Sequence, residues 1–158
     1  MKKTTGMGKL GEEKVERARG YARLLRRANY RIRFIGSEVF ERYGMTESQY
    51  LALLWISEHE GIIQADLVAE LDSDPNTVSA VLRQLEKKKL IRRKRHPNDG
   101  RAISLFASRS GKEMVGVIRP QIDRLTGSMF EVLPHGHEKA IAEWLEKLAQ
   151  IKNLPSPT

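Results

Sequence analysis

The spacing of apolar residues divides the chain into helical segments and one extended segment. Residues 14–43 repeat their apolar positions at the period of a helix, which predicts one long helix there. The apolar stripe of this helix consists of Val15, Ala18, Ala22, Leu25, Ile32, Ile35 and Val39. Gly44 is a suitable residue for its end, because glycine readily adopts the left-handed conformation that closes many helices.

A second helix is predicted to begin at Thr46 and to end near Gly61. Thr46 and Gln49 have the spacing of a capping box, in which each side chain accepts a hydrogen bond from the backbone N–H of the other. The apolar face of this helix is predicted to consist of Leu51, Leu54, Trp55 and Ile56.

Two further helices are predicted in quick succession, over residues 64–71 and from Pro75 to about Lys88. Pro75 fits the first position of a helix, and Asp74 is a typical N-cap. The buried stripe of the later helix is predicted to be Val78, Val81, Leu82 and Leu85. Its outer face then carries mostly short or polar side chains, namely Asn76, Thr77, Ser79, Ala80, Arg83 and Gln84.

Extended structure is predicted at residues 90–95 and 102–107, where apolar and polar residues alternate. The residues between them include Pro-Asn-Asp-Gly at 97–100, which is typical of a tight turn. The two strands should therefore pair as a hairpin.

Two helices are predicted after the hairpin. The first begins at Ser108, which can act as its N-cap, and runs to about Val132 with Pro120 inside it, where a kink is expected. Pro134 is predicted to begin the last helix. The apolar stripe of that helix is Ile141, Trp144, Leu145, Leu148 and Ile151, and it needs a surface to cover it.

Composition excludes several classes of protein. The chain of 158 residues has no cysteine, which excludes disulfides, a thiol redox switch and a thiolate metal site. It has no apolar run of the roughly 18 residues that a membrane span needs, and its basic N-terminus lacks the apolar core of a signal peptide. We therefore expect a cytoplasmic protein with no membrane partner.

Positive charge is concentrated in two parts of the chain. Residues 1–44 hold 12 Lys and Arg against 5 Asp and Glu, and residues 74–112 hold 11 against 3. Residues 45–73 hold 6 acidic residues and no Lys or Arg. Concentrated charge of one sign destabilises a fold unless an opposite charge is at hand. Nucleic acid is the commonest partner of this kind.

The second basic segment has the layout of a DNA-binding module. Two short helices joined by a tight turn describe a helix-turn-helix, and a basic hairpin directly after them describes a winged helix. The outer face of the helix 75–88 can enter a major groove, so double-stranded DNA is the predicted partner. The predicted DNA contacts are Asn76, Thr77, Ser79, Ala80 and Arg83 on the helix, and Arg92, Arg93, Lys94, Arg95, Asp99 and Arg101 on the wing.

Two residues of the predicted turn have distinct roles in this hypothesis. Arg101 is placed to enter a narrow minor groove, where the negative potential is enhanced. Asp99 would shape the turn or hold the guanidinium of Arg101 in position.

The order of the elements and two motifs resemble the MarR family of bacterial transcription regulators. Residues 76–88, Asn-Thr-Val-Ser-Ala-Val-Leu-Arg-Gln-Leu-Glu-Lys-Lys, are similar to that family's recognition helix. Leu-Ile-Arg-Arg at 90–93 followed by Asp-Gly-Arg at 99–101 is similar to its wing, and residues 105–108 with Gly111 resemble the join to its fifth helix. Lys89 stands where a glycine often ends the recognition helix, which predicts a less sharp end.

The resemblance implies a fold that is mainly α with a small β-hairpin wing (α+β). Residues 45–112 would form the winged helix-turn-helix domain, and residues 1–44 and 113–158 the helical dimerisation region of a homodimer. It also implies a small-molecule effector, often anionic or phenolic, that binds between the dimer core and the lobe and releases DNA. The absence of cysteine excludes the peroxide-sensing mode of some relatives.

Candidate effector contacts lie in two places. Arg23 and Arg27 belong to an Arg-rich set on the first helix, which could line a crevice for an aromatic carboxylate or an acyl-coenzyme A thioester. The same set could instead strengthen the field seen by DNA or form a solvated face. His59 lies close to where effectors of the family bind, and Trp55 is a further candidate, for which a position in the core is the simpler interpretation.

The leading hypothesis is a dimeric, sequence-specific regulator, a repressor that such an effector releases from a pseudo-palindromic operator. The alternative is a non-specific architectural nucleic-acid-binding protein on the same fold. An enzyme is not expected, because the sequence has no Gly-rich phosphate loop and no nucleophile–base signature. No cofactor is predicted, and the short cluster of His135, His137 and Glu138 is too small to predict a metal.

Overall fold

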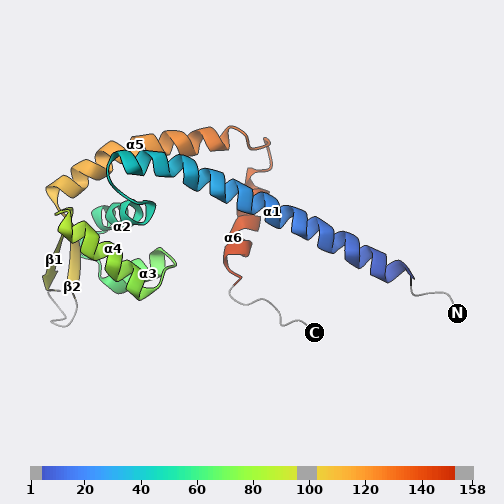
Figure 1. The fold of residues 1–158 in the computed structure, drawn as a ribbon, viewed down its shortest axis with the longest axis horizontal. Coiled ribbons are helices and arrows are strands. Elements are labelled where there is room, and N and C mark those ends of the chain that lie inside the picture. Colours follow the sequence, from blue (N-terminus) through green and yellow to red (C-terminus); the bar gives the residue numbers. More distant parts are fainter. Residues whose placement is uncertain (1–4, 96–102, 152–158) are drawn as a thin grey trace. The chain divides into compact units, whose positions relative to one another are not determined.

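The structure is a computed structural model that describes residues 5–95 and 103–151 (Figure 1). The chain divides into two compact units, residues 1–122 and 123–158. The first unit contains α1 (Thr5–Arg42), α2 (Glu47–Glu58), α3 (Gln64–Glu70), α4 (Pro75–Lys87), β1 (Ile91–Arg95), β2 (Ile103–Ala107) and most of α5 (Arg109–Phe130), and the second contains the end of α5 and α6 (Glu138–Ala149). The predicted fold class, mainly α with a small hairpin, is confirmed.

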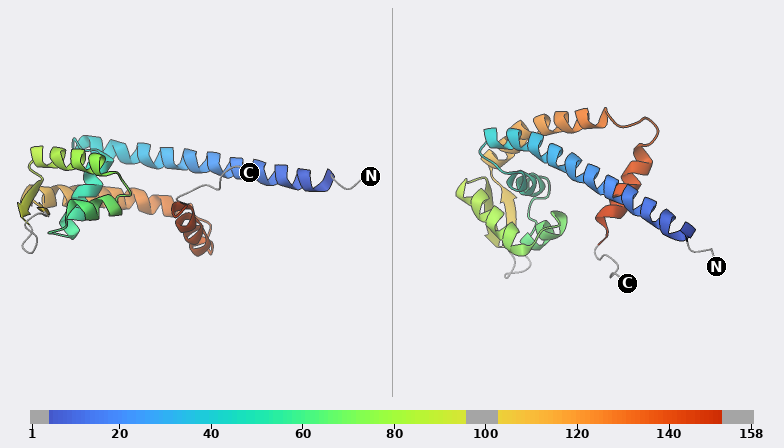
Figure 2. Two further views of the ribbon diagram at one scale, coloured as in Figure 1. Left: turned by 90° about the horizontal axis from the view of Figure 1, so that it is seen from below. Right: turned by 45° about the vertical axis from the view of Figure 1, so that its right-hand side comes forward.

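The first helix is longer than predicted and ends where predicted. α1 begins at Thr5 rather than near residue 14 and extends well beyond the lobe formed by α2, α3, α4 and the hairpin (Figure 2). Its end is closed by Gly44, whose φ of 62° is left-handed. Gly44 N–H donates to Glu41 O at 2.9 Å and Met45 N–H to Phe40 O at 3.0 Å. This pair of bonds is a Schellman motif, which satisfies carbonyls that the helix leaves open.

The core of the lobe takes one to three fully buried side chains from each of α2, α3, α4, β2 and α5. α2 contacts both α1 and α4, while α3 and α4 contact each other and the hairpin packs against them. The largest fully buried side chains are Leu53, Ile56, Leu67, Val78, Leu82, Leu85, Ser104, Leu105 and Ile118. The predicted stripe of the helix at 75–88 is therefore largely confirmed, with Val81 only half-buried.

α2 begins as predicted but buries a different face. The capping box is present: Gln49 N–H donates to Thr46 Oγ1 at 3.2 Å, and Thr46 N–H donates to Gln49 Oε1 at 3.4 Å. The buried residues are Tyr50, Ala52, Leu53 and Ile56. The prediction that Leu51 faces inward is wrong, since its side chain is 41% exposed. Apolar residues surround α2 on nearly all sides, so the spacing could not identify the face that α4 covers.

The hairpin has the predicted strands, and a segment that was not predicted to be extended bonds to the outer side of β2. β1 and β2 pair antiparallel, with Ile91 opposite Ala107 and Arg95 opposite Ile103. The linker between α2 and α3 also bonds to β2, because Gly61 N–H donates to Leu105 O and Leu105 N–H to Ile62 O, both at 2.8 Å. These bonds fix the hairpin to the start of the helix-turn-helix.

The last two helices differ from prediction at one boundary. α5 continues through Pro120, but α6 begins at Glu138 and not at Pro134. Gly136 has a φ of 83°, which no helix contains, so residues 134–137 form a turn. The apolar stripe of α6 is exposed at Trp144, Leu145, Leu148 and Ile151. Over the ranges that the structure describes, no helix is long and apolar enough to cross a membrane.

Candidate nucleic-acid interface

The start of α4 is held by Asp74, as the sequence predicted. The Asp74 carboxylate accepts hydrogen bonds from Asn76 N–H and Thr77 N–H, both at 3.0 Å, and from the Thr77 hydroxyl. The Thr77 hydroxyl bond is the main cause that lowers the pKa of Asp74 below its ordinary value, followed by the Thr77 backbone bond. The negative charge of ionised Asp74 also interacts favourably with the positive end of the helix dipole.

The outer face of α4 is open to solvent. Asn76, Thr77, Ala80 and Arg83 are all exposed on it. Arg83 has no ion pair with an acidic residue in the part of the chain that the structure describes, so its guanidinium can reach an external acceptor. The short residues before it let the backbone of the helix approach a surface closely. This geometry suits a helix that enters a major groove.

Ser79 has a structural role that the sequence did not reveal. Its hydroxyl accepts a hydrogen bond at 2.7 Å from the side-chain amide of Gln64, at the start of α3. The same amide donates to Pro75 O at 3.3 Å. Gln64 therefore fixes the angle between α3 and α4, and Ser79 is half-buried at their junction. Its predicted contact with DNA stays a prediction.

The end of α4 is sharp, so the prediction of a less sharp end at Lys89 is wrong. Lys89 adopts the left-handed conformation with a φ of 58°. Leu90 N–H donates to Leu85 O and Lys89 N–H to Glu86 O, at 2.9 and 2.8 Å. These bonds form a Schellman motif with a lysine at the position that glycine favours. Leu85 and Leu90 are both buried behind it.

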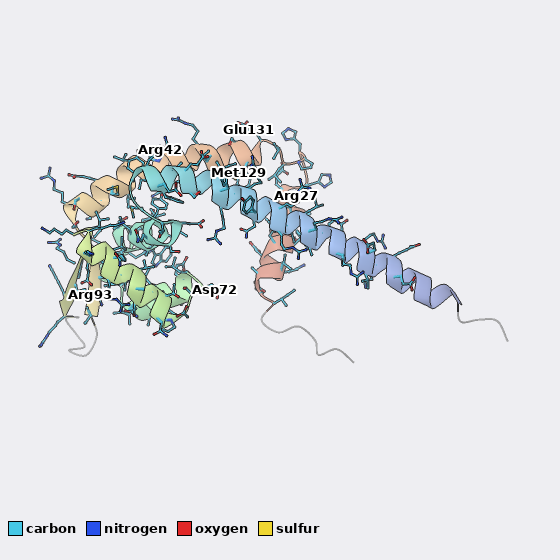
Figure 3. The ribbon with its side chains drawn as sticks, viewed as in Figure 1. Arg27, Arg42, Asp72, Arg93, Met129 and Glu131 are labelled. Carbon is cyan, nitrogen blue, oxygen red and sulfur yellow. The ribbon has the colours of Figure 1, made fainter. Side chains whose placement is uncertain are left out.

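α3 also ends in a Schellman motif whose left-handed residue, Asp72, is not glycine. Asp72 lies between α3 and α4 (Figure 3) and has a φ of 42°. Ser73 N–H donates to Val68 O at 3.2 Å and Asp72 N–H to Ala69 O at 3.4 Å. Asp72 is exposed, so its charge lies at the surface near the start of α4.

The cations of β1 lie in different surroundings. Arg92 and Arg95 are exposed. Arg93, labelled in Figure 3, forms an ion pair with Glu86 of α4, with 2.8 Å between Nε and Oε1, and its side chain is 29% exposed. Lys94 lies over the ring of Phe106, 5.2 Å from its centroid. Asp99 and Arg101, the predicted turn contacts, lie outside the described residues.

Lys88 joins the end of α4 to the junction between α1 and α2. Its ammonium donates to the carbonyl of Gly44 and, at 2.8 Å, to Gln49 Oε1. Gln49 is the residue that caps the start of α2. The recognition-helix candidate is thus linked through one side chain to the residues that close α1 and open α2.

The candidate effector contacts do not share one groove. Trp55 and His59 stack on each other, with 3.9 Å between their ring centroids, and line neither of the two grooves along α1 that Arg26 and Tyr30 line. Arg23 and Arg27 together line a groove along α1. Across residues 5–95 and 103–151, no group of three or more His, Cys, Asp or Glu could hold a metal ion.

A helix-turn-helix formed by α3 and α4, followed by the β1–β2 hairpin, defines a winged-helix module. Residues 45–103 match the model of the MarR family. The HTH-type transcriptional regulator MgrA of Staphylococcus aureus is 29% identical over 90 residues, which are 57% of this chain and 58% of MgrA. The chain therefore spans less than two thirds of the length of the curated relatives it matches.

Solved structures extend the likeness beyond the winged helix. The DNA complex of MepR from S. aureus has a TM-score of 0.75 at 24% identity, covering 82% of this chain and 96% of MepR. BpsR of Bordetella bronchiseptica, whose DNA binding is regulated by 6-hydroxynicotinic acid, has a TM-score of 0.74 at 26% identity, covering 82% and 92%. The winged-helix segment, residues 45–103, therefore matches the MarR family, and the solved structures show that the wider chain shares its fold with these proteins.

Proposed function

We propose that this protein is a dimeric, sequence-specific DNA-binding transcription regulator, a repressor that a small anionic ligand releases from its operator. The observation that carries the proposal is the outer face of α4, where short side chains surround an exposed Arg83, beside a hairpin with exposed Arg92 and Arg95. An exposed arginine on a helix that can enter a groove, with further cations on the hairpin beside it, suits base reading accompanied by phosphate contacts.

Exposed apolar residues support the dimer. On α6, Trp144, Leu145 and Leu148 are each at least 40% exposed. On α1, Val15, Leu24 and Ile32 are each at least 48% exposed. Apolar residues at this density on two helices favour burial against another surface. A second copy of the chain is a simple partner, since two-fold pairing also presents two recognition helices to a pseudo-palindrome. We therefore assign residues 1–44 and 113–158 to dimerisation and residues 45–112 to DNA binding.

The ligand is proposed on chemical grounds. The basic residues of α1 favour an anion, and 6-hydroxynicotinic acid, which regulates DNA binding by BpsR, is an aromatic acid. Arg23, Arg27, Trp55 and His59 stay candidate contacts, although only Arg23 and Arg27 line the groove along α1.

A non-specific architectural binder on the same fold is the second candidate. It is favoured by the strength of the basic segments, because phosphate contacts alone give sequence-independent binding. It is disfavoured by the short residues on α4, which bring a helix close to base edges.

Selection of bound fragments from genomic DNA separates the two candidates. The full-length protein is incubated with fragments at physiological salt and excess competitor, and the retained DNA is sequenced. Recovery of one pseudo-palindrome, with half-sites roughly one helical turn apart, supports the specific dimeric regulator. Recovery of fragments at random refutes it and leaves the architectural binder.

A further inference from the structure

β1 follows directly from the end of α4 (Figure 1) and is attached there through its backbone. Lys89 has a left-handed φ of 58°, and Leu90 N–H donates to Leu85 O at 2.9 Å. From this attachment β1 runs over five residues, Ile91–Arg95. At about 3.3 Å per residue, its far end lies roughly 13 Å from its start. A strand held only at its start can swing, and even a small change of angle displaces its far end.

An ion pair provides a second attachment between α4 and β1. Glu86 lies in the last turn of α4, and Arg93 is the middle residue of β1. Arg93 Nε lies 2.8 Å from Glu86 Oε1, and the two side chains are 29% and 34% exposed. The bond is charge-assisted and partly shielded from water and salt, so it is stronger than a pair of fully exposed residues. Two attachments along one strand fix its angle to α4, which one attachment cannot do.

The hairpin is also held on the side away from this ion pair. Leu105, which lies opposite Arg93 on β2, is fully buried, and its backbone exchanges hydrogen bonds with residues 61–62. Lys94 lies over the ring of Phe106, 5.2 Å from its centroid. The hairpin is thus attached to α4 through β1 and to the linker between α2 and α3 through β2.

The same ion pair makes Arg93 a poor phosphate contact. The Glu86 carboxylate offsets the charge of the Arg93 guanidinium, and a phosphate that approached Arg93 would also be repelled by Glu86. Transfer of Arg93 to a phosphate would leave Glu86 unpaired beside DNA. Arg92 and Arg95, by contrast, are exposed, and among the described residues neither pairs with a carboxylate.

We propose that Glu86 and Arg93 are positioning residues, which hold the hairpin at the angle to α4 that lets Arg92 and Arg95 reach phosphates while α4 lies in the major groove. The proposal rests on the regulator function stated above. It adds an acidic residue, Glu86, to those that DNA binding needs, and it removes Arg93 from the direct contacts. A hairpin that is already in position loses little orientational freedom when helix and wing bind together, which favours affinity.

Neutralising Glu86 separates this role from a phosphate contact by the sign of the effect. Glu86→Gln removes a negative charge from a DNA-binding lobe, so charge alone predicts tighter binding. Release of Arg93 to contact a phosphate would also tighten binding. Loss of the positioning ion pair instead weakens it, and we expect operator affinity to fall roughly fivefold. Fluorescence anisotropy with the full-length protein and the duplex recovered by genomic selection measures this. Unchanged or tighter binding would overturn the proposal.

The salt dependence of binding counts the phosphate contacts. Each contact contributes about 0.9 to the slope of log affinity against log salt concentration, so Arg95→Gln should lower the slope by about that amount. Glu86→Gln should lower the slope as well, although it removes no cation, because a displaced hairpin loses the contacts of Arg92 and Arg95. A steeper slope in Glu86→Gln would mean that the freed Arg93 binds phosphate, which would also overturn the proposal.

Glu113→Gln is the matched control. Glu113 pairs with Arg109 at 2.9 Å within α5, so this variant makes the same change of charge and also breaks one ion pair, but that pair joins no two elements. Its affinity for the operator should stay within roughly twofold of that of the unaltered protein. An equal loss in Glu86→Gln and Glu113→Gln would show that the link between α4 and β1 has no special role.

Reversal of the pair tests the link itself. Arg93→Glu alone should weaken operator binding roughly tenfold or more, because two carboxylates then face each other. Glu86→Lys/Arg93→Glu keeps the net charge of the unaltered protein and restores two opposite charges, so affinity should return to within roughly threefold. A reversed pair that binds as weakly as Arg93→Glu alone would mean that DNA needs the arginine itself, and the proposal fails.

Two further measurements separate the proposal from loss of fold and from the regulator function. Circular dichroism should show Glu86→Gln to be as helical as Glu113→Gln, and a loss of helix in Glu86→Gln alone would make the pair a stabilising contact and overturn the positioning role. Equal affinity of the unaltered protein for the operator and a scrambled duplex would refute sequence-specific regulation. The sign of the Glu86→Gln effect on either duplex would still decide the role of Arg93.

Discussion

Gly111 is the residue whose replacement should most clearly test the packing of α5 against the winged helix. It is buried in the first turn of α5, and its N–H donates to Ser108 Oγ at 3.0 Å. A Cβ added at Gly111 would lie 2.1 Å from the carbonyl oxygen of Leu90 and 3.1 Å from Cδ1 of Leu53. A backbone oxygen cannot rotate away as a flexible side chain can, so α5 and the start of β1 must separate by roughly 1 Å.

The cost of Gly111→Ala follows from three terms. Overpacking of a well-packed core costs about 1–3 kcal/mol. The separation also strains the hydrogen bond from Ser108 N–H to Leu90 O, now 2.9 Å, whose loss costs about 1 kcal/mol. Alanine in a helix gains about 1 kcal/mol over glycine. We therefore expect Gly111→Ala to lower the free energy of unfolding by about 1–3 kcal/mol.

Gly116→Ala is the matched control on the same helix. Gly116 is exposed, and a Cβ there meets no atom within 4 Å. Only the preference of a helix for alanine over glycine remains, so this variant should raise the free energy of unfolding by about 0.5–1 kcal/mol. Urea unfolding followed by helical circular dichroism, at one fixed protein concentration, measures both. Equal stability of the two variants would refute the close approach of α5 to Leu90.

Three further predictions concern the interface itself. Lys89→Gly should raise the free energy of unfolding by about 0.5–1 kcal/mol, because glycine removes the cost of the left-handed φ; urea unfolding that shows no gain would contradict the strain at this position. The pKa of Asp74 is lowered in the folded protein, so its contribution to stability is present above the ordinary value of 3.8 and is lost as pH falls through the lower, folded value. Asp74→Asn keeps an N-cap without the charge, so the melting temperature of this variant should fall less steeply with pH over that acid range. A slope equal to that of the unaltered protein would contradict the stabilising role of the ionised Asp74. Arg83→Ala and Arg101→Ala should each weaken operator binding by about 1–3 kcal/mol in fluorescence anisotropy, and only Arg83→Ala should relax sequence preference. Unchanged affinity for both would leave the proposed interface without support.

Local signals in the sequence predicted most element boundaries correctly. The capping box at Thr46, the cap of Asp74 before Pro75 and the stop at Gly44 each depend on bonds within a few residues. Such bonds form in almost any tertiary context, so their residue types identify helix ends. The start of α6 was missed because Pro134 suits a first helical position, while Gly136 turned the chain instead.

Contacts between distant residues could not be predicted in this way. Spacing did not show that Leu53 rather than Leu51 faces the core, because apolar residues surround α2 and α4 decides which face is covered. The pairing of Arg93 with Glu86 and the bond from Gln64 to Ser79 each join different elements. These two interactions depend on how the elements are arranged in space, and residue type alone does not determine that arrangement.

The sequence by itself determined the class of fold, the identity of the outer residues of α4 and the concentration of cations on the hairpin and the first helix. Periodicity, caps and charge are local properties that one chain segment carries without its neighbours. The tertiary structure decided that Arg93 pairs with Glu86 across two elements, and it placed Arg23 and Arg27 along a groove of α1 that Trp55 and His59 do not line. It also brought residues of α1 together with Met45, Thr46 and Glu47 in one groove, because this groove forms where α1 meets the start of α2.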